Sequence, residues 1–116
     1  MAKKVVLKKV EDKFPLTGIY LKDSEDLVFT VYDGARDKYL APFLAQTIVQ
    51  AKRFIYEQIN VSSTSYFALY PRSYKLFRVG VFDHNTGLIK TTERFFYGTF
   101  DKILAEIELD KGATNG

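Results

Sequence analysis

Aromatic and basic residues alternate along the segment from Arg72 to Tyr97, and this pattern is the one best able to support binding chemistry. Side chains of a strand point to opposite faces in turn, so Lys75 and Phe77 should share one face and Leu76 and Arg78 the other. Ring faces stack on unpaired bases, and neighbouring cations neutralise phosphates. The segment therefore predicts a folded surface suited to nucleic acid.

The centre of this segment predicts a four-residue turn, His84 to Gly87, between two antiparallel strands. Gly87 is the residue best able to take the positive φ that closes such a loop. This loop length pairs Phe82 with Ile89. It also places Arg78 opposite Glu93 as a cross-strand ion pair. A three-residue loop would instead shift the register by one and reverse the faces of the return strand.

Tyrosines at strand ends or beside turns, each close to a basic residue, are the candidates for stacking on bases: Tyr32, Tyr39, Tyr70 and Tyr74. The basic neighbours expected to contact phosphates are Arg36, Lys38, Arg72 and Lys75. Phenylalanines within strands are more often core residues, which we expect for Phe29, Phe67, Phe77 and Phe82. Lys52 and Arg53 are expected on the solvent side of a helix.

The formal charge of +3 is concentrated near the N-terminus and in the middle of the chain. Lysines of the first segment form a candidate electrostatic arm for DNA, whose binding would weaken steeply with salt: Lys3, Lys4, Lys8 and Lys9. A solubilising terminus explains the same lysines equally well.

Several kinds of chemistry find no support in the sequence. The chain has no cysteine, and His84 is its one histidine, which argues against metal sites built on several such ligands and against a Ser-His-Asp arrangement. Asp33 and Asp83 are expected to form turns. We therefore expect a protein that is not an enzyme and has no metal or cofactor. No apolar run is long enough to span a bilayer, so we expect a cytoplasmic location.

The 116 residues predict one α+β domain, in which an antiparallel sheet of four to five strands carries two helices on one face. Residues 1–26 are expected to form a basic N-terminal extension, with short strands near Leu7 and at 19–21. Residues 27–112 are expected to form the domain itself. A small sheet with a bare face commonly dimerises, so we expect a homodimer.

The element boundaries follow from local patterns. Strands are expected at 27–33 and at 39–45, where Pro42 predicts an edge or a bulge. Thr47 and Gln50 predict a helix start by the capping-box pattern, with the helix ending near Asn60. Residues 66–70 are expected to be extended. A second helix is expected from Phe100 to about Lys111, stopped by Gly112.

The chain resembles the small nonstructural proteins of the gokushoviruses, single-stranded DNA phages of the microvirus group. The resemblance covers about residues 27–93, and its motifs stand here in the family's order: Tyr32-Asp33, Pro42-Phe43, Ala51 to Phe54, Tyr74-Lys75-Leu76, and Phe82 to Gly87. The long N-terminal extension and the C-terminal helix depart from the family's usual pattern.

This resemblance implies a DNA-binding protein that helps the phage switch from duplex replication to making and packaging single strands in the host cytoplasm. Single-stranded DNA is then the expected partner, with phage capsid or replication proteins as possible others. The residues alone do not distinguish DNA from RNA. An assembly or host-adaptor protein that binds a partner protein is the alternative, and it predicts salt-insensitive association through an exposed apolar patch.

Overall fold

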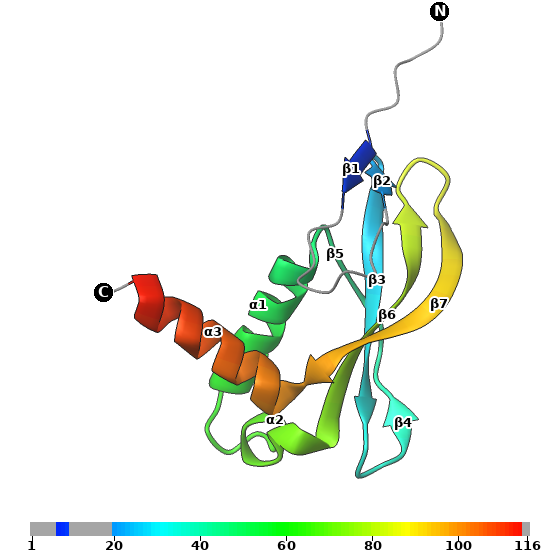
Figure 1. Cartoon of the computed structure of the whole chain (residues 1–116). Coiled ribbons are helices and arrows are strands. Elements are labelled where there is room, and N and C mark those ends of the chain that lie inside the picture. The colour runs from blue at the N-terminus through cyan, green and yellow to red at the C-terminus, as the bar shows by residue number, and fades with distance from the viewer. Residues whose placement is uncertain (1–6, 10–19, 115–116) are drawn as a thin grey trace, which may run out of the picture.

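The protein is described by a computed structural model that covers residues 7–9 and 20–114 (Figure 1). The strands are β1 (Leu7–Lys9), β2 (Tyr20–Lys22), β3 (Glu25–Asp33), β4 (Lys38–Tyr39), β5 (Phe43–Ala45), β6 (Tyr74–Asp83) and β7 (Leu88–Thr99). The helices are α1 (Ile48–Asn60), α2 (Tyr66–Leu69), the 3-10 turn η1 (Pro71–Ser73) and α3 (Phe100–Thr114).

Five strands form an antiparallel sheet in the order β4-β3-β6-β7, and β5 pairs with β3 on the same edge as β4. The segment 38–45 is thus one edge strand interrupted around Pro42, as the sequence predicts. The α+β class and the antiparallel sheet are confirmed. The short strands expected near Leu7 and at 19–21 correspond to β1 and β2, which pair with each other in a separate two-stranded sheet and not with the main sheet.

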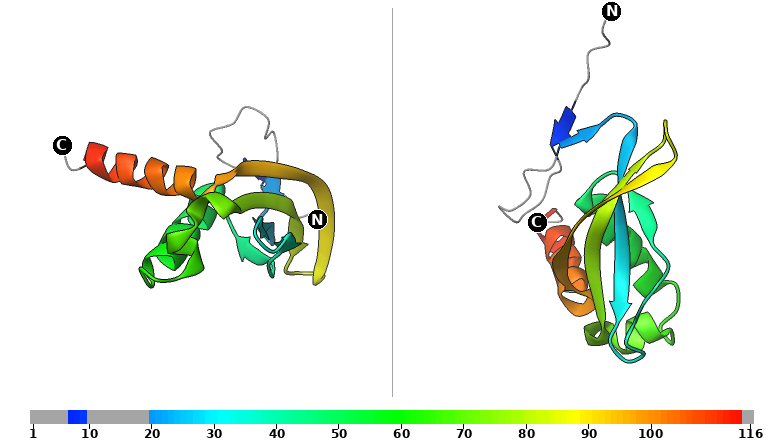
Figure 2. Two further views of the ribbon diagram at one scale, coloured as in Figure 1. Left: turned by 90° about the horizontal axis from the view of Figure 1, so that it is seen from below. Right: turned by 90° about the vertical axis from the view of Figure 1, so that its right-hand side faces the viewer.

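One core joins the sheet to the helices. Its fully buried members include Phe29 on β3, Leu76 on β6, Ile55 on α1 and Ile103 on α3. Helices α1 and α3 both lie to the left of the strands in Figure 1, and α3 projects away from the sheet in the left view of Figure 2. Leu21 also belongs to this core, while most of the predicted extension 1–26 lies outside the described residues.

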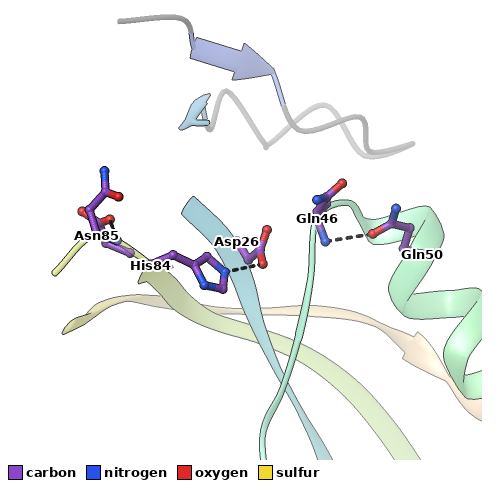
Figure 3. A network of polar contacts seen from close by, with 6 residues as sticks. Asp26, Gln46, Gln50, His84 and Asn85 are labelled. Atoms are coloured by element: carbon purple, nitrogen blue, oxygen red, sulfur yellow. Dashed lines mark hydrogen bonds and ion pairs between the residues drawn. The ribbon is translucent and has the colours of Figure 1, made fainter. Parts of the chain in front are cut away.

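Helix α1 begins and ends where the sequence predicts. The Thr47 hydroxyl accepts a hydrogen bond from the Gln50 backbone N–H at 3.1 Å, and the Gln50 side chain accepts one from the N–H of Gln46 at 3.0 Å (Figure 3). The reciprocal bond reaches one residue further back than a capping box requires. Lys52 was expected in solvent, but it is buried and its Nζ lies 2.9 Å from Oε2 of Glu106 on α3.

Two element predictions are wrong. Residues 66–69 form helix α2 instead of an extended segment, because Ser65 caps them by accepting a hydrogen bond from the N–H of Ala68 at 3.2 Å. Gly112 does not end the last helix, which continues to Thr114. The other end of that helix is as predicted, since β7 stops at Thr99 and α3 begins at Phe100.

The β6–β7 hairpin has the predicted turn but not the predicted register throughout. Gly87 has φ +72° and Phe82 pairs with Ile89, as expected. Beyond Gly80 the register shifts, so that Arg78 pairs with Phe95 and the predicted ion pair with Glu93 is wrong. At the turn, His84 Nε2 lies 2.8 Å from Oδ2 of Asp26, which links the hairpin to the start of β3 (Figure 3).

Candidate nucleic-acid interface

Four aromatic rings line up across the sheet on the face turned away from the helices. Leu76 and Arg78 of β6 are buried toward the core, so the residues between and beside them, Lys75 and Phe77, point outward. The same alternation places neighbours from the three other strands on that face. We define the outer-face cluster as Tyr39 of β4, Tyr32 of β3, Lys75 and Phe77 of β6, and Arg94 and Phe96 of β7.

The rings of this cluster touch in sequence. Ring centroids lie 5.0 Å apart for Tyr32 and Tyr39, 6.0 Å for Tyr39 and Phe77, and 5.4 Å for Phe77 and Phe96. These separations fall within the range of favourable aromatic contacts. The result is a continuous band of ring surface that crosses four strands.

Two cations lie over the band. The Arg94 guanidinium is 5.1 Å from the ring centroid of Phe77 and 5.5 Å from that of Tyr39. Lys75 Nζ lies 6.0 Å from the ring centroid of Tyr32. All three distances fit cation–π contacts, and both cationic side chains are exposed. Positive charge is therefore held directly beside flat apolar surface.

The tyrosine hydroxyls of the band have partners at its edge. Tyr32 donates to the Asp37 carboxylate, and Tyr39 accepts from Arg94. The hydrogen bond to Asp37 is the main reason that the pKa of Tyr32 is raised above its ordinary value, followed by desolvation. Tyr32 therefore stays neutral at physiological pH, and its ring is held in place.

The cluster is open to solvent at its two ends. Tyr39 is 44% exposed and Phe96 is 48% exposed, whereas Tyr32 and Phe77 between them are half-buried. Exposed large aromatics on a sheet face are unusual for a residue type that normally fills cores. This arrangement can stack unpaired bases on the rings and neutralise their phosphates.

A second group of candidates lies on the other side of the β3–β4 turn. Tyr70 is exposed and its ring centroid lies 6.2 Å from that of Tyr66, also exposed. Arg36 and Arg72 are exposed as well, and their Nε atoms lie 3.9 Å and 3.8 Å from carboxylate oxygens of Asp33 and Asp101 respectively. The residues predicted from the sequence to bind nucleic acid therefore fall into two groups, one in the outer-face cluster and one around Tyr70, Arg36 and Arg72.

Tyr74 is a correction to the stacking candidates. It is 5% exposed, and its ring packs against those of Phe67 and Phe100 at 4.8 Å and 5.3 Å. Tyr74 opens β6 directly after η1, where the short helix α2 covers it. Its ring face is therefore occupied by the core.

The remaining basic candidates are placed only in part. Lys38 is exposed on β4 and pairs with Asp33, so it points away from the outer-face cluster. Lys3 and Lys4 lie outside the described residues. The backbone of Lys8 and Lys9 forms β1, and their side chains lie outside the described part of the chain.

Sequence reasoning missed Arg94, Phe96 and the exposed side of Phe77. Phe77 was expected in the core, but only its inward neighbours are fully buried. Alternation along β7 does put Arg94 and Phe96 on one face, so a signal existed. The alternation alone could not place these two residues, because the register shift between β6 and β7 decides which face of the sheet they occupy.

None of the helices in the described residues is long and apolar enough to cross a membrane. A family model described as Phage ORF5 protein matches residues 26–95, which is more than half of the chain. The chain belongs to the Phage ORF5 family. It is therefore a bacteriophage protein. No curated protein and no solved structure matches it.

The part shared with the ORF5 family runs from the start of β3 into β7. It contains the whole outer-face cluster except Phe96, which lies one residue beyond it. It also contains α1, α2 and the β3–β4 turn. Helix α3, which completes the core through Phe100 and Ile103, lies outside the matched segment.

Proposed function

We propose that this ORF5 protein binds single-stranded DNA through the outer-face cluster and performs no catalysis itself. In the host cytoplasm it would aid the phage's switch from duplex replication to the synthesis and packaging of single-stranded genomes. This role rests on the resemblance to gokushovirus nonstructural proteins.

The observation that carries the proposal is the band of four rings under two cations. Base–aromatic stacking contributes about 1–3 kcal/mol per base, and it tolerates any sequence because every base has a ring face. Arg94 and Lys75 lie over these rings, and both are near enough to meet the phosphates of a strand whose bases take the ring surface. A duplex hides its base faces, so the band favours unpaired strands.

The charged contacts should make the affinity for DNA depend on salt concentration. Each phosphate neutralised by Lys or Arg releases counterions, so affinity for a single strand falls with salt in proportion to the number of contacts. The N-terminal lysines Lys3, Lys4, Lys8 and Lys9 would extend the contact as a basic arm. The proposal therefore includes an affinity that is strong at low salt and weak at high salt.

Fluorescence anisotropy with a labelled oligonucleotide of about 12 nucleotides tests the proposal. We expect micromolar or tighter binding at low salt, a loss on raising salt, and much weaker binding to the matched duplex. The absence of binding even at low salt would overturn it. An RNA oligonucleotide of the same sequence, measured in parallel, would show whether the sugar is distinguished.

The alternative function is an adaptor that binds a partner protein, such as a phage capsid or replication protein. Exposed apolar side chains on β5 and α1 favour it, namely Leu44, Val49 and Phe54. Association with such a partner would be insensitive to salt, unlike DNA binding. We also propose a homodimer, which sedimentation with and without single-stranded DNA would test.

A further inference from the structure

A depression of about 200 Å³ lies beside α2, on the other side of the β3–β4 turn from the outer-face cluster. It is smaller than the roughly 300–1,000 Å³ of sites for drug-sized ligands, so it suits a single planar ring system. Its lining combines the rings of Tyr66 and Phe67 with the polar side chains of Asp33 and Tyr74.

The Asp33 carboxylate is held in a fixed position. Asp33 is 3% exposed, and its Oδ1 accepts hydrogen bonds from the backbone N–H groups of Ala35 at 3.0 Å and Arg36 at 3.3 Å. The turn itself is tied to η1, because the N–H of Gly34 donates to the carbonyl of Ser73 at 2.7 Å. Oδ2 lies 3.9 Å from Nε of the exposed Arg36 and keeps capacity to accept a hydrogen bond.

Tyr74 lines the depression and lies near enough to Asp33 to feel its charge. Its hydroxyl makes no hydrogen bond to another described residue, and it is not fully sealed from solvent. Burial, and then the charge of Asp33, raise the pKa of Tyr74 above its ordinary value. The hydroxyl therefore keeps its proton and can donate. A hydroxyl with free hydrogen-bonding capacity at the wall of a depression can donate to a ligand held there.

We propose that the depression binds one base of the DNA strand and prefers bases with an amino group beside an unprotonated ring nitrogen. The exocyclic amine donates to Asp33 Oδ2, and the ring nitrogen accepts from the Tyr74 hydroxyl. Cytosine (N4 and N3) and adenine (N6 and N1) present this pair of groups, whereas thymine presents a carbonyl where the amine is required.

Neighbouring groups complete a nucleotide site. The exposed ring of Tyr66 offers a stacking face at the rim, with Tyr70 next to it. Arg36 and Arg72 are 65% and 90% exposed in their side chains and can reach the phosphates on either side of the bound base. The inference rests on the proposed function, and it adds a base preference that the outer-face cluster lacks.

The test compares oligo(dC) with oligo(dT) of equal length by anisotropy, since both carry pyrimidines. We expect the wild-type protein to bind oligo(dC) about five-fold or more tightly than oligo(dT). Tyr74→Phe removes only the hydroxyl and should reduce this ratio to about two or less. Tyr56→Phe is the control, because Tyr56 does not line the depression and bonds to Glu108 on α3.

The substitution Asp33→Asn tests the inference independently. Asparagine also forms such turns, but its amide can present an N–H₂ donor where Asp33 Oδ2 accepts from the exocyclic amine of the base. The preference for oligo(dC) should therefore be lost or reversed toward oligo(dT). Equal binding of the two oligonucleotides by the wild type, or a preference that survives both substitutions, would overturn the inference alone. No binding of either oligonucleotide would instead overturn the proposed function.

Discussion

The Arg94 guanidinium covers the ring of Tyr39 across the two strands that lie between them, 5.5 Å from its centroid, and hydrogen-bonds to its hydroxyl. Tyr39 lies on β4 and Arg94 on β7, at opposite edges of the sheet. In the free protein Arg94 occupies ring surface that a base would need. A bound strand would therefore displace Arg94 from the ring, and the freed cation would meet a phosphate.

Arg94→Ala should weaken binding of single-stranded DNA and lower the slope of log affinity against log salt by about 0.7, the value for one phosphate contact on a single strand. Arg53→Ala is the matched control, since Arg53 is exposed on α1. Anisotropy titrations at several salt concentrations measure both quantities. Equal slopes for the two variants would contradict a phosphate contact by Arg94.

Phe96→Ala should reduce affinity for single-stranded DNA by about 1–3 kcal/mol, the contribution of one stacked base. Its thermal midpoint should change little, because the side chain is about half exposed. Phe54→Ala removes a ring of similar exposure from α1 and should leave DNA affinity unchanged. A similar loss of affinity in both variants would indicate a general effect on folding.

Arg78 carries a positive charge that is buried in the core. It is 5% exposed, its Nη1 donates to the Tyr97 hydroxyl at 2.6 Å, and its Nε has no hydrogen-bond partner in the part of the chain that the structure describes. No carboxylate forms an ion pair with it among the described residues. Replacing a buried charge by an apolar side chain of similar length is often neutral or stabilising.

Arg78→Met should therefore keep or raise the free energy of unfolding, measured by urea denaturation. Tyr97→Phe should lower it by about 1–3 kcal/mol, because the buried guanidinium then loses its hydrogen bond. A large destabilisation by Arg78→Met would show that the stacking of Arg78 on Phe95, at 5.1 Å, matters more than its desolvation.

Gly80→Ala should destabilise the β6–β7 hairpin. A Cβ at this position would lie 2.6 Å from the carbonyl oxygen of Lys90, so the paired strands would have to separate. We expect a loss of about 1–3 kcal/mol, as for other overpacked sites, seen as a lower thermal midpoint. Gly87→Asn is the control, because asparagine tolerates its positive φ and nothing lies within 4 Å of the added Cβ.

Asp101 gives a pH-dependent prediction. The hydrogen bond from Thr99 is the main cause that lowers the pKa of Asp101 below its ordinary 3.8, and Arg72 adds to the effect. A lowered folded-state pKa stabilises the fold above the unfolded pKa, and this stability disappears as pH falls through the folded value. Asp101 also lies in the first turn of α3, where negative charge is favourable.

Asp101→Asn should therefore cost about 0.5–1 kcal/mol at pH 7, and the difference from wild type should shrink below about pH 4. Urea denaturation at a series of pH values measures it. Glu57→Gln, an exposed position on α1, should show no such trend. A difference that stays constant down to pH 2 would contradict the electrostatic origin.

Local patterns in the sequence were enough to place much of the fold. The cap at Thr47, the turn at His84 to Gly87 and the junction at Thr99 all depend on residues within a few positions of one another. Such short-range chemistry is readable without knowing what packs above it. The α+β class and the antiparallel sheet followed from the same patterns.

Only the tertiary structure decided which side chains are buried and which come together. The register shift in β6–β7 moved Arg78 away from Glu93. Tyr74 is buried because its ring packs against Phe67 of α2 and against Phe100 of α3, and Phe100 lies far from Tyr74 in sequence. The outer-face cluster joins residues of four strands, from Tyr32 to Phe96. The sequence by itself determined that rings and cations alternate; packing across the sheet decided which of them face solvent together.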